Sequence, residues 1–443
     1  MSREKTQGKQ NNLAKLTILQ QEDWWAVWLG VLIIGLVVAG WLAKPVLPGR
    51  WGQGTGIFSA VPPEILTGIV LTGLVSLTVF ALSIFFYGRK SLGKFLLAFP
   101  VVFILAIAAE LLGGYTPLRH YGINNVIWAL VLGLFISNTV KTPEFLKAGV
   151  RTELYIKTGL VLLGASILFD RMLALGALGL GVAWMVTPVV LVFMYWFSQK
   201  YLKMQEQRGL AIAVASATSV CGVSAAIAAG TAAKAKKEEI SLAISVTLIF
   251  TIIMMVAMPA VIRIAGISDT VGGAWLGGTI DATGAVVASA SMLSEQAMEI
   301  ASVIKMIQNI LIGVIAFAVA VIWVSVDEKG VATTEKVKVS PLEIWNRLPK
   351  FIIGFIGASL IFSFVVPDGV VQASSGAING FRNFFFTLAF VSIGLESNFK
   401  KMAGMVKGGS PVTLYIVGQT VNLVLTLLAA YVFFSGQFFP LPF

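Results

Sequence analysis

The sequence has little charge and almost none of the residues that form disulfides or metal clusters. Only 12% of its 443 residues are charged, whereas an average soluble domain has roughly 25%. Cys221 is the single cysteine and His120 the single histidine. One cysteine excludes an internal disulfide and a cysteine-based metal cluster. We therefore expect neither a metal nor a cofactor.

Several larger patterns are also missing. The chain lacks the alternating ten-residue strands of an outer-membrane barrel, a nucleotide-binding signature, and a cleavage site after its first apolar run. What it has instead is 57% hydrophobic residues, arranged in apolar runs of about 20 residues that can span a bilayer. The net charge is +11, and the lysine and arginine residues lie in short loops, as the positive-inside rule describes. Because membrane topology accounts for the basic residues, we expect no nucleic-acid partner. The fold class is an all-α polytopic membrane protein.

The apolar runs predict about eleven transmembrane helices plus two broken or re-entrant segments. The predicted spans are residues 24–43, 64–87, 95–112, 124–140, 158–169, 173–197, 240–262, 298–324, 351–366, 381–395 and 411–434. Residues 113–122 and 367–380 are expected to form outside loops.

The basic loops place the N-terminus in the cytosol of a multi-pass protein of the cell (inner) membrane. Residues 1–23 then form a cytosolic tail, and residues 24–434 a single transmembrane transporter domain. A cytosolic linker interrupts this domain at about 327–350, and residues 435–443 form a short external C-terminus.

The two interrupted segments, residues 209–233 and 272–293, resemble each other. Aligning Ser219 with Thr279 superimposes two runs of hydroxyl, glycine and small apolar residues. Broken backbone at membrane depth is tolerated only where it is buried in protein or lines a cavity. Paired glycine-interrupted segments also point to the binding site of a transporter. Each segment is either a crossing helix or a hairpin, and the basic loop around Lys236 favours hairpins.

A second similarity between two parts of the chain suggests inverted repeats. The spacing Gly-x4-Phe-x2-Met at residues 164–172 recurs at residues 394–402. The predicted topology runs these two stretches in opposite directions across the membrane, as in many secondary transporters.

Asp281 and Lys305 are the charged candidates for the site. A carboxylate inside the membrane costs about 2.5–3.5 kcal/mol on insertion scales and indicates function by default. Asp281 is predicted to bind the coupling ion, a proton or sodium; the alternative is that it caps the following half-helix. Lys305 could pair with Asp281 or hold an anion; the alternative is that it reaches to the membrane surface.

The remaining candidates are hydroxyl-bearing or small residues at the two breaks. Half-helices that start at a break direct N–H groups into a cavity and bind oxyanions, while the exposed carbonyls suit a sodium ion. Cys221 is interpreted mainly as a small packing residue, and the amides of Asn138, Gln419 and Asn422 as contacts between helices. The predicted substrate-binding set is Thr218, Ser219, Cys221, Gly222, Ser224, Gly278, Thr279, Thr283, Gly284 and Lys305.

At these motifs the chain resembles the YeiH-like family of bacterial membrane proteins, whose name proposes that its members export sulfate. Two motifs match in full, T-S-x-C-G-V-S-A at 218–225 and G-x-V-L-L-G at 159–164. Three match in part: G-T-S-I-H-D-T-A-x-V-V-A at 277–288, I-V-K at 303–305, where this chain has Val-Ile-Lys, and G-x-x-x-G-N at 133–138, where Ser137 replaces the second glycine. The resemblance covers roughly residues 124–434 and extends distantly to the superfamily of sodium/proton antiporters and bile-acid symporters. Where the family often has His-Asp, this chain has Asp281-Ala282, which changes the charge at the predicted site.

The resemblance and the breaks together predict a secondary active transporter for a small anion, sulfate-like or an organic sulfonate or carboxylate. The alternatives are a cation/proton antiporter centred on Asp281 and, less favoured, a membrane-embedded enzyme, for which the sequence lacks a His/Asp/Glu cluster, metal-ligand spacing and a Ser-His pair. We expect the anion, a proton or sodium ion, the bilayer and a second copy of the chain in a homodimer as partners.

Overall fold

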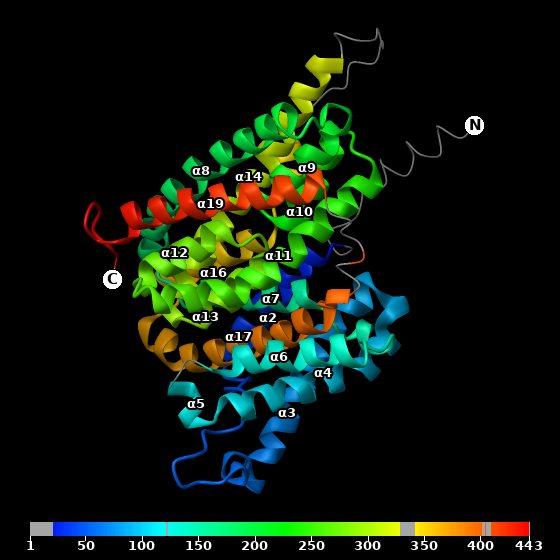
Figure 1. Ribbon diagram of the computed structural model, residues 1–443. Coiled ribbons are helices and arrows are strands. Elements are labelled where there is room, and N and C mark those ends of the chain that lie inside the picture. The colour runs from blue at the N-terminus through cyan, green and yellow to red at the C-terminus, as the bar shows by residue number, and fades with distance from the viewer. Residues whose placement is uncertain (1–20, 121–122, 328–341, 401–403, 405–408, 443) are drawn as a thin grey trace. The chain divides into compact units, whose positions relative to one another are not determined.

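The computed structural model describes residues 21–120, 123–327, 342–400, 404 and 409–442. Helices dominate these residues, and the only β-pairings among them are two isolated bridges in the loop after the first helix and near Tyr115. The chain separates into two compact units, each built from two stretches of sequence. The all-α fold class is confirmed (Figure 1). The prediction of a single transmembrane domain stays a prediction.

Unit 1 is drawn from Met1–Phe169 and Lys350–Asn398. Its helices are α2 (Glu22–Val38), α3 (Pro63–Tyr87), α4 (Leu92–Gly113), α5 (Thr116–His120), α6 (Asn125–Thr139), α7 (Thr152–Gly164), α16 (Phe351–Phe364) and α17 (Asp368–Glu396). Aromatic side chains fill part of its core: the ring of Phe80 packs edge-on against Tyr155 and Phe385, at centroid distances of 4.6 and 4.8 Å.

Helices α6 and α17 of unit 1 pack backbone to backbone. A Cβ atom on Gly133 would lie 2.5 Å from the carbonyl oxygen of Val391, and one on Gly394 would lie 2.6 Å from that of Leu130. Small residues allow such close approach between membrane helices. Ser137 then donates from its hydroxyl to the carbonyl of Gly394 at 2.9 Å, so the crossing combines close packing with interhelical hydrogen bonds.

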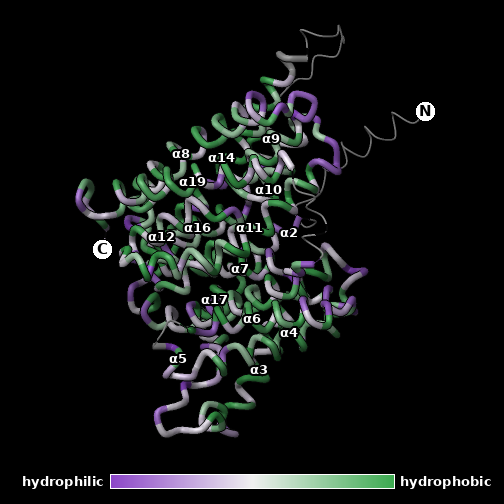
Figure 2. Tube along the Cα trace, viewed as in Figure 1, coloured by the Kyte–Doolittle hydropathy of each residue, from purple (hydrophilic) through white to green (hydrophobic). Residues whose placement is uncertain are grey.

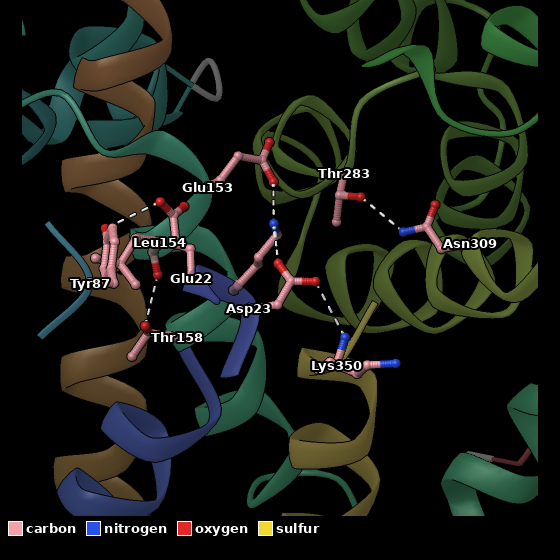
Figure 3. Close-up of polar contacts among 10 residues, drawn as sticks. Glu22, Asp23, Tyr87, Glu153, Leu154, Thr158, Thr283, Asn309 and Lys350 are labelled. Carbon is pink, nitrogen blue, oxygen red and sulfur yellow. Dashed lines mark hydrogen bonds and ion pairs between the residues drawn. The ribbon is translucent and has the colours of Figure 1, made fainter. Parts of the chain in front are cut away.

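A polar network joins the start of α2 to α7 and α16 in unit 1. Lys157 Nζ lies 2.7 Å from a carboxylate oxygen of Asp23 and 3.1 Å from one of Glu153. The other oxygen of Asp23 accepts from the backbone N–H of Lys350 at 3.3 Å (Figure 3). The beginning of α2 is therefore fixed to the beginning of α16, although more than 300 residues separate them.

Unit 2 is drawn from Asp170–Pro349 and Phe399–Phe443. Its helices are α8 (Phe169–Lys200), α9 (Arg208–Ser219), α10 (Gly222–Ala232), α11 (Lys237–Ile264), α12 (Asp269–Thr279), α13 (Thr283–Ser291), α14 (Glu295–Asp327), α15 (Leu342–Arg347) and α19 (Ser410–Phe434). Helices α9–α10 and α12–α13 are the two interrupted segments, each broken by two or three residues.

Each predicted span corresponds to a helix. Among the described residues, seven helices are long and apolar enough to cross a membrane, and α6, α10 and α16 are shorter apolar helices. Hydrophobic residues cover the helices, and hydrophilic residues gather largely at helix ends and connecting turns (Figure 2). A polytopic membrane protein is the architecture that this pattern supports. The predicted sidedness, the cytosolic tail and most of the linker are not tested, because residues 1–20 and 328–341 lie outside the described part.

The first interrupted segment is a hairpin. A Cβ on Gly209, at the start of α9, would lie 2.8 Å from Ala235, just beyond the end of α10. A Cβ on Gly230, near the end of α10, would lie 3.2 Å from Ala213 in the first half of α9. The two helices therefore run antiparallel and the chain reverses at the break, which resolves the choice between crossing helix and hairpin.

The second interrupted segment also folds back. A Cβ on Gly272, near the start of α12, would lie 3.2 Å from Leu293, just after α13. Gly273 of α12 packs against Ala297 of α14, and Gly277, one turn later, packs against Ala301. Hairpin 1 below denotes α9–α10 and hairpin 2 denotes α12–α13.

Two predicted outside loops are wrong in part. Residues 368–380 belong to α17, which starts after Pro367 rather than at Phe381. The polar residues in this stretch suggested a loop, but they belong to a helix that starts directly after the N-cap residue Pro367. Within predicted loop 113–122, residues 116–120 form the short helix α5. The inverted repeat stays a prediction, because Met402 lies outside the described residues.

Candidate functional site

The tips of the two hairpins meet in the interior of unit 2. The N–H of Gly222, the first residue of α10, donates to the backbone carbonyl of Asp281 at 2.9 Å. Gly222 also packs closely against α11, since a Cβ there would lie 2.7 Å from a methyl group of Thr247. The predicted pairing of the two breaks is thus a direct contact.

Asp281 lies in the break of hairpin 2 and is 1% exposed. Its Oδ2 accepts from the Tyr415 hydroxyl of α19 at 2.5 Å and from Thr251 of α11 at 3.4 Å. Its Oδ1 is buried without a hydrogen-bond partner. Helix α13 begins after Ala282, without a side-chain cap. The alternative in which Asp281 serves only as the helix cap is therefore wrong.

Lys305 of α14 is also 1% exposed, so the alternative in which it reaches to the membrane surface is wrong. Its Nζ donates to the carbonyl of Val220 at 2.5 Å and to Oε1 of Gln308 at 2.7 Å. Among the described residues it forms no ion pair with Asp281. The positive charge of Lys305 instead lies at the C-terminal end of α9, which is the negative end of the helix dipole.

Gln308 of α14 is hydrogen-bonded to both hairpins. Its amide nitrogen donates to the carbonyl of Ser219 at 2.9 Å and to that of Gly278 at 3.1 Å. These carbonyls lie at the ends of α9 and α12, where helix geometry leaves them without intrahelical donors. One side chain therefore satisfies a helix end in each hairpin.

Two amides of α19 reinforce the same helix ends. Gln419 donates to the carbonyl of Thr279 at 3.1 Å, and Asn422 lies 3.5 Å from the carbonyls of both Thr218 and Thr279. In unit 1, Asn138 donates to the carbonyl of Ser397 at 2.9 Å. The interpretation of these three amides as contacts between helices is confirmed.

The hydroxyls predicted for hairpin 1 have different surroundings, and their role in substrate binding stays a prediction. Thr218 and Ser219 each donate to the carbonyl four residues earlier in α9, at 2.8 Å, a local bond that serine and threonine often form inside helices. Ser224 is exposed on the first turn of α10. Cys221 is 9% exposed and belongs to an apolar cluster with Val220 and Ala225, as its packing interpretation predicts.

The corresponding residues of hairpin 2 are arranged differently. The hydroxyl of Thr279 is buried without a partner, and that of Thr283 accepts from the amide of Asn309 at 3.1 Å (Figure 3). Gly278 packs against Thr426 of α19, and Gly284 is buried in the first turn of α13. The structure therefore places Thr279, Asp281 and Thr283 together at one break, and Lys305 one helical turn before Asn309 on α14.

Sequence reasoning missed two polar contributors, Tyr415 and Thr251, which both reach Asp281. Neither has a distinctive neighbourhood in the sequence, because each is a single polar residue in an apolar run. A polar residue inside a predicted span is the one signal that could have marked them. The described residues hold no cluster of three or more His, Cys, Asp or Glu side chains that could bind a metal ion.

Comparisons with known proteins match most of the chain. Residues 97–408 match the model of a family described as conserved hypothetical protein 698. The chain is 48% identical over 407 residues to a UPF0324 membrane protein of Rhodopirellula baltica, covering 89% of this chain and 73% of that protein. It is 48% identical over 382 residues to a UPF0324 membrane protein of Nitratidesulfovibrio vulgaris, covering 82% and 64%.

A UPF0324 membrane protein of Nitrosomonas europaea is 27% identical over 452 residues, covering 87% of this chain and 90% of that protein. The chain thus spans a little less than two thirds of the Nitratidesulfovibrio protein but nearly all of this more distant one. No solved structure matches the chain significantly.

Proposed function

The chain belongs to the conserved hypothetical protein 698 family of UPF0324 membrane proteins, the YeiH-like family that its motifs indicated, and from this premise we propose that it is a secondary active transporter for a small anion. Transport would proceed by alternating access around the hairpin tips in the inner membrane, coupled through Asp281. The substrate class is sulfate or an organic sulfonate or carboxylate. Transport is preferred to catalysis because the tips offer groups suited to binding.

One observation carries the anion proposal. The N-terminal ends of α10 and α13 both start at the contact between the hairpin tips, and the buried ammonium of Lys305 lies beside the same breaks. Helix N-termini and a buried cation together favour an oxyanion. Lysine has three N–H donors, and Val220 and Gln308 accept two of them, so one donor remains for an anion.

The test measures substrate binding before transport. The purified protein is screened by thermal shift against sulfate, alkyl sulfonates and carboxylates, because a ligand that binds the native state raises the unfolding temperature. For the anion that stabilises, Lys305→Ala and Lys305→Gln should both raise the dissociation constant about 10- to 100-fold, the equivalent of about 1.5–3 kcal/mol for a charged hydrogen bond.

The control is Lys200→Ala, a lysine at the end of α8 that lies over the ring of Trp196; it should leave binding unchanged. Uptake of the same anion into proteoliposomes then tests transport. If no oxyanion stabilises the protein, or if the Lys305 variants bind like the parent, the anion proposal is wrong.

A cation/proton antiporter is the second candidate, and the unpartnered Oδ1 of Asp281 favours it. This function needs no anion. It predicts that adding sodium or potassium to proteoliposomes holding an acidic interior collapses the pH gradient in the absence of any transported anion. An anion requirement for that collapse would favour the first candidate.

A further inference from the structure

In the described part of unit 2, two oxygens that can only accept hydrogen bonds are buried with neither a hydrogen-bond donor nor an ion pair. They are Oδ1 of Asp281, a residue that is 1% exposed, and Oδ1 of Asn309, a residue that is 2% exposed. An ionised carboxylate and an amide carbonyl have no hydrogen to give. A buried acceptor without a donor costs about 1–3 kcal/mol, so each such atom in a native protein calls for an explanation.

These oxygens belong to one small region. Asn309 binds Thr283 through its amide nitrogen, which places the amide beside the first turn of α13 and two residues from Asp281. Two residues before Asp281, the Thr279 hydroxyl is buried and also has no partner. Three unsatisfied oxygens therefore come from the five-residue stretch 279–283 and from the turn of α14 that is bonded to it.

We infer that Thr279 Oγ1, Asp281 Oδ1 and Asn309 Oδ1 form a binding site for a sodium ion. The inference rests on the proposed transport function and specifies its coupling ion. A hard cation takes oxygen ligands from carboxylates, hydroxyls and carbonyls. The site has one carboxylate, which balances one positive charge.

The surroundings favour a monovalent over a divalent ion. Lys305 brings a second positive charge to the region, and its ammonium is bound to Val220 and Gln308 rather than to Asp281. A doubly charged ion would therefore have one carboxylate to offset it and a buried ammonium nearby. Tyr415 and Thr251 occupy Oδ2 of Asp281, which directs Oδ1 to the proposed ion.

The experiment is a titration of the purified protein in detergent with NaCl, KCl or choline chloride at constant ionic strength, read as the unfolding temperature. Sodium should raise the unfolding temperature saturably, and potassium and choline should not. Thr279→Val and Asn309→Ala should each raise the apparent sodium dissociation constant about tenfold or more, since each removes one ligand. Thr279→Ser keeps the hydroxyl and should restore sodium affinity.

The control is Thr218→Val, a threonine in hairpin 1 next to Ser219, the residue that aligns with Thr279. Its hydroxyl bonds within its own helix, and the variant's sodium affinity should equal that of the parent. Equal stabilisation by all three salts, or equal sodium affinities in Thr279→Val and Thr218→Val, would overturn the site. If low pH raises the unfolding temperature and sodium does not, Oδ1 of Asp281 binds a proton and the sodium site is wrong. Sodium binding without transport in proteoliposomes would retain the site and reject the proposed function.

Discussion

Hairpins 1 and 2 have similar sequences but distribute their polar groups in opposite ways. In hairpin 1, Thr218 and Ser219 direct their hydroxyls into their own helix, and the tip carries no charge. In hairpin 2, the hydroxyl of Thr279 and one oxygen of Asp281 are buried without partners. Similar composition has produced one break whose hydroxyls, those of Thr218 and Ser219, are bonded within their own helix and one break whose oxygens lack a partner.

The difference separates a structural half from a chemical half. Hairpin 1 contributes backbone: the carbonyl of Val220 holds Lys305, and the N–H of Gly222 holds hairpin 2 in place. Hairpin 2 contributes side chains. Since backbone groups are insensitive to the identity of most residues, substitutions in the hydroxyls of hairpin 1 should matter less than substitutions in hairpin 2.

The largest expected effect is the loss of ion coupling in Asp281→Asn. The amide keeps the shape but removes the carboxylate charge, so sodium- or proton-driven anion uptake into proteoliposomes should fall by more than about tenfold, corresponding to at least about 1.4 kcal/mol. Ser219→Ala in hairpin 1 should retain uptake within about twofold. Equal losses in both variants would contradict the division between the hairpins.

Gln308→Leu should produce the next largest effect, on stability. It removes the amide donor to the carbonyls of Ser219 and Gly278. The Ser219 carbonyl still accepts from Thr187, so the cost of about 1–3 kcal/mol for an unsatisfied group falls on the Gly278 carbonyl. Gln419→Leu is the matched variant and should cost less, because Asn422 also lies near the Thr279 carbonyl. Unfolding temperatures in one detergent measure both; an equal decrease would mean that Gln308 does not couple the hairpins.

Gly222→Ala should give the smallest effect. The added methyl meets Thr247 at 2.7 Å, and overpacking of this kind costs about 1–3 kcal/mol. The control is Gly376→Ala in α17, where nothing lies within 4 Å; there alanine should be neutral or slightly stabilising, since it is the better helix former. A neutral result at both positions would show that Thr247 moves aside without cost and that the close packing at Gly222 does not stabilise the protein.

The sequence was sufficient to predict the helices and both breaks, because bilayer thickness sets the length of an apolar span. It failed where a polar stretch was helical, as in the first half of α17, since composition does not reveal which face a residue occupies. It also could not distinguish Thr218 from Thr279. Both are threonines before a break, and only tertiary packing determines whether a hydroxyl bonds to its own helix.

Asp281 and Lys305 were identified because charged residues are rare inside a membrane, but the sequence left open whether the two form an ion pair, and the described residues show none between them. The structure instead places Lys305 against the Val220 carbonyl and Asp281 against Tyr415. Contacts between residues 85 and 134 positions apart depend on how helices pack, and no local pattern encodes that arrangement.

The interleaving of the two units has a consequence for biosynthesis. Each unit begins in the first part of the chain and is completed by a later segment, α16–α17 for unit 1 and α19 for unit 2. Tyr415 follows Asp281 by 134 residues. At a translation rate of about 5–20 residues per second, Tyr415 is synthesised roughly 7–27 seconds after Asp281. During that interval the nascent hairpin 2 holds its carboxylate without its shortest hydrogen bond. The Asp281 side chain therefore enters the membrane before the helix that supplies its closest hydrogen-bond donor has been made.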